Sequence, residues 1–284
     1  MLISLSKNMK YSIIILFGTL SLYITSCTDN AVEHNAPSAS YNEIISGNAG
    51  EYNIQMFITG ADSLTTGYND VYFKVKKGTT EQNSGLVKMF PKMWMTPRFM
   101  HSTPVSPTFV YDNSTGYYKG YAIYIMSTSP PIVVWYSVLT YRDENGIDHT
   151  TDSIPTYTAF HREKQWRIFF DSTDQSSYMI TLLKPFSPVK GYNDFAMMLH
   201  RTEGTMIDYQ LITSAQMFMS VYELDSANQS TGNINPTPGA DGIYRGRINL
   251  PYPGDWNACD TIFYNGHYIT NTPPPMPEFN FSIR

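Results

Sequence analysis

The sequence predicts an all-β protein, and three observations lead to that prediction. Short runs of β-branched and aromatic residues alternate with polar residues and are separated by turn dipeptides. The body of the chain repeats at a period of about 125 residues, and no stretch has a sustained helical period with caps. About seven short strands in each copy predict two tandem immunoglobulin-like β-sandwich domains, which follow a signal peptide and a tether.

Composition and charge exclude several classes of protein. Aromatic residues make up 14% of the 284 residues, so the chain has enough apolar surface to bury and is not predicted to be disordered. The formal net charge is −5, and we expect no nucleic-acid partner because such binding depends on neutralising phosphates. The sequence contains no Gly-x-Ser-x-Gly, His-Glu-x-x-His or P-loop motif, so we do not expect an enzyme.

The N-terminus is predicted to be a targeting segment. Lys7 and Lys10 precede an apolar stretch over residues 11–24, which is shorter than the ~20 residues that span a bilayer. The run Ile-Thr-Ser-Cys that ends at Cys27 resembles a lipobox, whose thiol takes a diacylglycerol. We expect residues 1–26 to be a lipoprotein signal peptide and the lipidated cysteine to anchor the protein in the bacterial cell envelope, in the outer membrane on its periplasmic or surface side. The alternative is an ordinary secretory signal that contains a cysteine.

The rest of the chain is divided into a tether and two domains. The polar residues 27–50 are predicted to be a flexible tether between the lipid and the first domain. The tandem domains then cover residues 51–171 and 176–284, and the second is the more degenerate copy. Since Cys27 is assigned to the lipid, Cys259 has no cysteine partner, and we interpret it as a core residue.

Landmarks recur in the same order in both halves of the chain. The run Gly-Tyr-Asn-Asp begins at residue 67 and again at residue 191, an offset of 124. Met-Trp-Met at 93–95 corresponds to Met-Phe-Met at 217–219 with the same offset. A constant order and a nearly constant offset predict a tandem duplication. Further pairs, at offsets of 120 to 126, are Tyr52 with Tyr178, Gly116 with Gly242, and Asn145-Gly146 with Asn265-Gly266.

The expected strands follow from their patterns. Each alternates between apolar and polar positions or forms a β-branched and aromatic run, and the Asn-Gly dipeptides favour tight hairpins. The strand at residues 166–170 is expected to close the first copy, and the strand at residues 279–283 the second. These strands lie at residues 71–75, 121–126, 132–141, 166–170 and 279–283.

A methionine cluster lies in the first copy. Met93 and Met95 share one face of a strand, and Met100 and His101 begin the following loop. Thioethers and an imidazole together suit a soft cation, above all Cu(I). The alternative is that the methionines fill the core, as methionine often does.

The second copy leaves both interpretations open. It keeps Met217 and Met219, but Asp225 stands 124 residues after His101. Either the Met-x-Met pair packs in the core of both copies, or the second copy has lost a site that the first retains.

A family resemblance supports the metal hypothesis. Met-x-Met followed by Met-His-Ser-x-Pro-Val, within residues 91–105, resembles YtkA-like domains, which are related to FixH-type proteins. The resemblance covers about residues 52–142 and, more weakly, 178–265. It implies an extracytoplasmic immunoglobulin-like domain with a copper or other heavy-metal role. The residues that carry over are Met93, Met95, Met100 and His101, with Met126 as a weaker candidate. We also keep Met89, Met217 and Met219 as weaker metal candidates.

Other noticeable residues have structural interpretations. We interpret Trp94 as a core residue and His200, at the end of an expected strand, as a surface residue. Asp70 and Asp194, which recur in the two Gly-Tyr-Asn-Asp runs, are typical of turns that cap their own backbone.

The sequence therefore predicts a lipid-anchored envelope protein that binds copper or a similar soft metal ion through its first domain. It would act as a buffer or donate the metal to another envelope protein. The alternative is a non-enzymatic structural or recognition module that binds a protein or a glycan at the cell surface. The crowding of Tyr111, Tyr117, Tyr118 and Tyr121 favours this alternative, although tyrosine also suits the core of a sheet.

Overall fold

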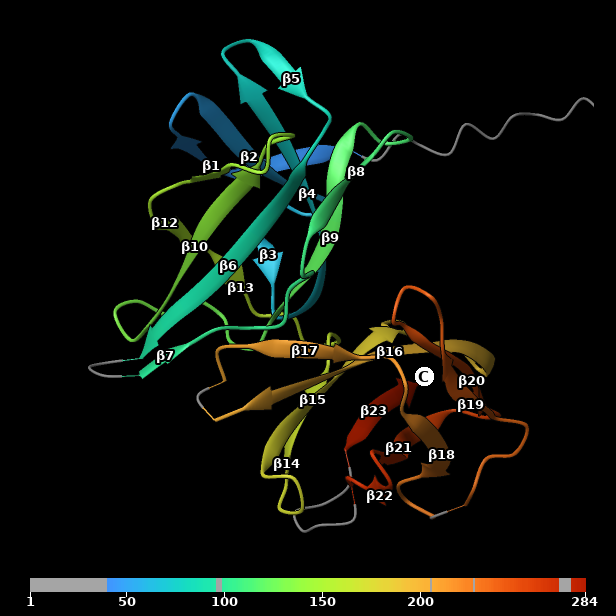
Figure 1. Ribbon diagram of the computed structural model, residues 1–284. Coiled ribbons are helices and arrows are strands. Elements are labelled where there is room, and N and C mark those ends of the chain that lie inside the picture. Colours follow the sequence, from blue (N-terminus) through green and yellow to red (C-terminus); the bar gives the residue numbers. More distant parts are fainter. Residues whose placement is uncertain (1–39, 96–98, 205, 227, 271–276) are drawn as a thin grey trace, which may run out of the picture. The chain divides into compact units, whose positions relative to one another are not determined.

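The computed structural model describes residues 40–95, 99–204, 206–226, 228–270 and 277–284. Within these ranges the chain forms strands, turns and loops and no helix, so the predicted all-β class is confirmed. It follows that the described residues contain no helix long and apolar enough to cross a membrane. Residues Ser40–Arg284 form one compact unit (Figure 1). The predicted signal peptide and Cys27 lie outside the described residues.

Strands β1 to β13 form the first set, coloured blue to yellow-green in Figure 1. Most join one antiparallel sheet in the order β1-β2-β4-β9-β8-β6-β10-β11, to which β5, β7 and β12 add, and β3 and β13 form a small parallel pair. Their bounds are β1 (Tyr41–Ala49), β2 (Tyr52–Thr59), β3 (Leu64–Thr65), β4 (Gly67–Lys77), β5 (Thr80–Gln82), β6 (Leu86–Met95), β7 (Phe99–His101), β8 (Phe109–Asp112), β9 (Tyr117–Tyr124), β10 (Val133–Arg142), β11 (Asp148–Thr150), β12 (Ile154–Thr156) and β13 (Thr158–Ala159).

Strands β14 to β23 form the second set, coloured yellow to red. They make two antiparallel sheets, one in the order β14-β15-β16-β20-β19 with β17 beside β16, and one in the order β18-β21-β22 with β23 beside β21. Their bounds are β14 (Trp166–Asp171), β15 (Ser176–Lys184), β16 (Gly191–Glu203), β17 (Tyr209–Ile212), β18 (Gln216–Glu223), β19 (Ile234–Pro238), β20 (Tyr244–Leu250), β21 (Gly254–Tyr264), β22 (His267–Tyr268) and β23 (Glu278–Ile283).

The two sets repeat the same strand pairings. The neighbours β1-β2-β4-β9 correspond to β14-β15-β16-β20, and β6-β10-β11 corresponds to β18-β21-β22. The Gly-Tyr-Asn-Asp runs begin β4 and β16, and the Met-x-Met segments lie in β6 and β18. This pairing pattern supports the tandem duplication that the sequence predicts.

The Gly-Tyr-Asn-Asp runs also form the same local structure. Asn69 accepts a bond from the backbone N–H of Thr65 (2.9 Å) and donates to its carbonyl oxygen (2.8 Å). Asn193 does the same with Val189, at 2.8 and 2.7 Å. A side-chain amide thus closes the turn before β4 and before β16, which explains the recurrence without a functional role.

Two predicted boundaries were wrong. Residues 27–50 were predicted to be a flexible tether, but β1 occupies Tyr41–Ala49 and pairs with β2 over its whole length. Residues 166–170 were expected to close the first copy, but β14 pairs with β15 and opens the second set. β1 and β14 occupy corresponding positions, each just before the strand with which it pairs. The first set therefore begins before residue 51 and the second before residue 176, which were the predicted starts.

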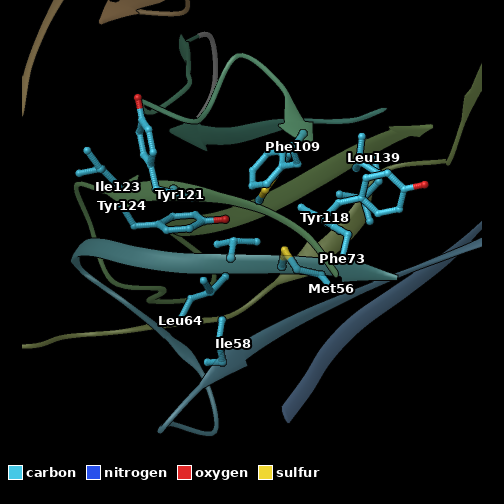
Figure 2. Close-up of a cluster of buried hydrophobic side chains, with 14 of the residues drawn as sticks. Met56, Ile58, Leu64, Phe73, Phe109, Tyr118, Tyr121, Ile123, Tyr124 and Leu139 are labelled. Carbon is cyan, nitrogen blue, oxygen red and sulfur yellow. The ribbon is translucent and has the colours of Figure 1, made fainter. Parts of the chain in front are cut away.

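The first core lies between the two halves of the rolled first sheet. Side chains of β2, β4 and β9 meet those of β6 and β10, for example where the rings of Tyr124 and Trp135 pack edge to face at 5.0 Å. Figure 2 shows Met56, Phe73 and Phe109 in this core, with the ring of Tyr121 rising away from them. Each fully buried aliphatic or aromatic side chain contributes about 2 kcal/mol by leaving water.

The second core lies between the two sheets of the second set, and Phe195 on β16 meets Phe279 and Phe281 on β23 there. β15 and β16 are buried on both faces. Alternate residues face the second core, while Met179 and Met198 belong to the first core. This double burial explains the continuous apolar runs of these two strands, and it joins both sets into one packed unit.

Among the buried ionisable side chains are a carboxylate and an imidazole with polar atoms that lack a hydrogen-bond partner among the described residues. Asp260 on β21 is fully buried, and neither carboxylate oxygen has a hydrogen-bond partner among the described residues. Burial raises the pKa of Asp260 to about 8. Its neighbours Ala258 and Ile262 face the second core, so the side chain points the same way, towards an apolar interior.

The other buried group is His200, which is almost completely buried although the sequence favoured a surface position. Its Nε2 lies 2.9 Å from the hydroxyl of Tyr121 on β9, while its Nδ1 has no partner among the described residues. Burial lowers the pKa of His200 to about 3, so the imidazole is neutral at physiological pH. The pair connects β16 to the first set.

Candidate functional site

The methionine strand β6 places Met93 inside the first core. Its side chain is completely buried, and its backbone partners are Trp135 on β10 and His101 on β7. Residues directly opposite each other on antiparallel strands share a face and lie about 5 Å apart. The structure therefore brings Met93 and His101 together on the inner face of the sheet.

Of the other two predicted ligands, Met95 and Met100, the second does not lie on this face. Met100 pairs with Trp94 and so lies on the outer face, away from Met93. The backbone of Met95 pairs with Phe99 and Val133, and its side chain lies outside the described ones. The predicted four-ligand cluster is thus divided between two faces of β6 and β7.

His101 keeps a feature of chemical interest. Its side chain is half-buried, and its Nδ1 is buried without a hydrogen-bond partner among the described residues. A buried polar atom normally has a partner, so an orphaned ring nitrogen beside a thioether is a position where a soft cation could be held. Within the described ranges, no group of three or more His, Cys, Asp or Glu side chains could hold a metal ion.

The weaker metal candidates are packed in the two cores. Met89 is buried in the first core, and Met126 packs against it. Met217 is buried in the second core, and Met219 packs against that core. The Met-x-Met pattern therefore recurs in β6 and β18 with an inward-facing methionine in each, which favours packing as the reason for the repeat.

The residue between the two methionines points outwards in both sets. Trp94 is 49% exposed, so its interpretation as a core residue was wrong, and Phe218 at the corresponding position is 44% exposed. Successive side chains of a strand point to opposite faces, so the burial of Met93 and Met217 turns the residue after each of them to solvent. An outward aromatic residue has thus been kept at the same position of both copies.

Apolar side chains surround Trp94 on the outer face of β6, β7 and β10. Trp94 lies between Met100 on one side and Val134 on the other. The next outward pairs along the same two strands are Lys92 with Tyr136 and Phe90 with Val138. We call this surface, from Phe90 to Trp94 with its outward neighbours, the Trp94 face.

The surface around Phe218 is also aromatic. The ring of Phe218 lies 6.5 Å from that of Tyr268, which in turn lies 5.2 Å from that of Phe263. Tyr268 is 45% exposed. We call these three residues the Phe218 face.

The remaining predicted residues have packing roles. Tyr118 is buried in the first core, Tyr121 is engaged by His200, and Tyr117 stacks on Tyr41 with ring centroids 4.2 Å apart. Cys259 is buried, and burial raises the pKa of its thiol to about 12, which suits a core residue and not a nucleophile.

Comparisons with known proteins add little to this picture. No family model matches the chain, and no curated protein matches it. Among solved structures, the chain is similar to a marsupial T cell receptor, with 7% sequence identity over 82% of this chain and 97% of the other, at a TM-score of 0.23. This similarity concerns the fold alone.

Proposed function

We propose that this protein is a lipid-anchored, non-enzymatic recognition protein of the bacterial cell envelope, and that it binds a partner protein through the Trp94 and Phe218 faces. The observation that supports the proposal is the outward aromatic residue at the same position of both repeats. The lipid anchor rests on the lipobox-like run that ends at Cys27.

The exposed aromatic residues of β6 and β18 favour binding. A tryptophan that is half exposed forgoes part of the free energy that its burial would contribute, so packing does not explain its position. Tryptophan, tyrosine and methionine are enriched at the centres of protein interfaces, and Trp94, Tyr136 and Met100 lie together on the Trp94 face.

The chemistry of the Trp94 face favours a protein over a glycan. A glycan presents many hydroxyl groups, which need amide and carboxylate side chains as partners. The outward residues of β6 and β10 from position 88 to 94 and from 134 to 140 include no Asn, Gln, Asp or Glu. They offer valines, aromatic rings, two lysines and one threonine instead, which suit an apolar protein surface with acidic residues at its rim.

Loss of the aromatic rings is expected to abolish partner capture. The mature chain from residue 28, with Trp94→Ala and Phe218→Ala together, should retain a partner at least tenfold less well than the unchanged chain, because truncating such anchors costs 2 kcal/mol or more. The measurement is quantitative mass spectrometry of detergent-solubilised envelope proteins captured on immobilised chain. Tyr157→Ala is the matched control, since Tyr157 is 61% exposed outside both faces.

Two results would contradict the proposal. The first is equal capture by the double variant and the control. The second is binding to glycans, and to no envelope protein, in a parallel array screen.

A soft-metal function is the second candidate, and the orphaned Nδ1 of His101 supports it. The described residues supply two soft donors on one face, the thioether of Met93 and the imidazole of His101. This pair is compatible with Cu(I).

A competition titration with Cu(I) tests this candidate. The mature chain should bind one equivalent, and His101→Ala and Met93→Leu should each weaken binding by tenfold or more because one of few donors is lost. Met56→Leu is the control, since Met56 is an equally buried methionine of the same core. Equally weak Cu(I) binding by all four proteins would mean that Met93 only packs in the core.

A further inference from the structure

A large cavity lies where the segment that links the two sets meets the last strand. It has a volume of about 880 Å³ and is open to solvent along residues 161–167, 185–188 and 280–284. Small-molecule sites are typically clefts of about 300–1,000 Å³. The size therefore suits a small organic ligand.

The cavity is basic although the chain as a whole is acidic. Arg162, Arg167 and Arg284 line it, together with His161, and Glu163 is the carboxylate side chain among the described lining residues. Glu163 lies 3.5 Å from Nδ1 of His161 and is not within ion-pair distance of a lining arginine. The local charge is thus positive in a chain whose formal net charge is −5.

Ion pairing separates the arginines of this cavity from most others that the structure describes. Elsewhere in the described ranges, three arginines pair with a carboxylate, and a fourth lies over an aromatic ring, as Arg167 lies over the ring of Phe279. Those partnered arginines are Arg142 with Asp148, Arg201 with Asp174, Arg245 with Asp241, and Arg247 over the ring of Tyr192. Within the described residues, no ion pair forms at Arg162, Arg167 or Arg284, so three guanidinium groups without an ion pair line the same cavity.

Arg167 is held in position by neutral groups. Its guanidinium donates to the carbonyl oxygen of Trp166 at 2.9 Å and to Oε1 of Gln165 at 3.3 Å. Gln165 is itself fixed, because its Nε2 donates to the carbonyl oxygen of Asn280 at 2.6 Å and its Oε1 accepts from the N–H of Asn280 at 2.9 Å. A guanidinium has five N–H donors, so several remain for a ligand on a preorganised scaffold.

Burial strengthens the case for an anion. Arg167 is half-buried, and burial lowers its pKa because the charge is poorly solvated, an effect that the charge of Glu278 offsets only in part. Charge-assisted hydrogen bonds from arginine to carboxylate or phosphate are strong and directional. The ring of Phe186 on the facing loop adds an apolar wall that a simple inorganic ion would not use.

We propose that this cavity binds a small organic anion, whose carboxylate or phosphate groups are held by Arg162 and Arg167. The site is separate from the Trp94 and Phe218 faces and goes beyond the proposed function. Carboxylate and phosphate share the same oxyanion chemistry, and the probes in the test distinguish them.

Calorimetric titration of the chain from residue 28 tests the site, with citrate and phenyl phosphate as probes and glucose as a neutral comparison. At least one anion should bind with one-to-one stoichiometry, glucose should not bind, and the affinity should fall as salt is added. Arg162→Gln and Arg167→Gln should each weaken binding about tenfold, since each removes a charge-assisted contact.

Arg142→Gln is the matched control, because Arg142 is an arginine whose charge is already paired with Asp148 at 2.6 Å. It should bind the anion as the unchanged chain does. The thermal midpoint of unfolding of each variant checks its folding. Because Arg162 is exposed, Arg162→Gln leaves the hydrogen bonds between Gln165 and Asn280 intact. Absence of binding for both anions, or binding that survives the loss of both arginines, would overturn the proposal.

Discussion

Asp260→Asn is expected to stabilise the protein at pH 7 by roughly 4 kcal/mol while changing its stability near pH 4 very little. The folded protein keeps this buried carboxyl protonated up to a pKa of about 8, whereas the unfolded chain ionises near pH 4. Between these values, unfolding releases a proton. The free energy of unfolding therefore falls by ~1.4 kcal/mol per pH unit as pH rises. The asparagine has no proton to lose and removes that slope.

Urea unfolding of the mature chain at pH 4, 5, 6, 7 and 8 measures this effect. The difference in unfolding free energy between Asp260→Asn and the unchanged chain should grow steadily with pH. Asp255→Asn, an exposed aspartate of the same strand, is the matched control. A constant difference at every pH would mean that the carboxyl of Asp260 finds a partner that keeps it charged.

His200→Gln is expected to have the opposite pH dependence. Burial holds the pKa of His200 at about 3, whereas the unfolded chain binds a proton near pH 6.5. The stability from the neutral imidazole is complete above pH 6.5 and is lost progressively as pH falls towards 3. At pH 4 this loss amounts to roughly 3 kcal/mol, and a glutamine, which does not titrate, avoids it.

The same unfolding series, extended to pH 3, tests His200. Tyr121→Phe is the control, because it removes the hydroxyl that lies 2.9 Å from Nε2 but leaves the buried imidazole. It should lower stability by about 1 kcal/mol at every pH. If His200→Gln and the unchanged chain lose stability in parallel below pH 6, the imidazole is able to take up its proton in the folded state.

Asp260 and His200 together determine how the free energy of unfolding of the unchanged protein depends on pH. Between pH 4 and 6.5 their slopes oppose each other, so the contributions of Asp260 and His200 nearly cancel. Above pH 6.5 only the aspartate titrates, and stability falls. Asp260→Asn should therefore reveal the slope of His200, and His200→Gln the slope of Asp260.

The repeat and several strands, such as β4, β9 and β10, could be predicted from the sequence because the period of two and the landmark motifs are local signals. β1 was missed because Tyr41–Ala49 is polar and only partly buried, with no clear alternation. Its partner β2, by contrast, alternates regularly between buried and half-buried positions. An edge strand of this kind is set by its neighbour more than by its own composition.

The orientation of β6 could be predicted only in part. Alternation places Met93 and Trp94 on opposite faces, but it does not say which face meets the core. The large ring suggested burial, and the structure buries the thioether instead. The charge of Lys92, which lies on the same face of β6 as Trp94, was the local signal for the outward face.

The burial of His200 and the basic cavity depend on contacts between distant segments. His200 is buried because β16 packs against both cores, which no pattern within the strand reveals. Arg162 and Asn280 meet at one cavity although more than a hundred residues separate them in the sequence. Spacing along the chain carries no signal for such a site.

The double burial of β15 and β16 has an evolutionary consequence. After a gene duplication, one copy is usually free to decay or be deleted, because the other still folds. Here Met179 and Met198 of the second copy complete the core of the first, so deletion of either copy would expose apolar surface in the other. Selection for folding alone then retains both copies, and their loops are free to diverge. This accounts for a second copy that keeps its strands and its outward aromatic residue while Asp225 stands where the first has His101.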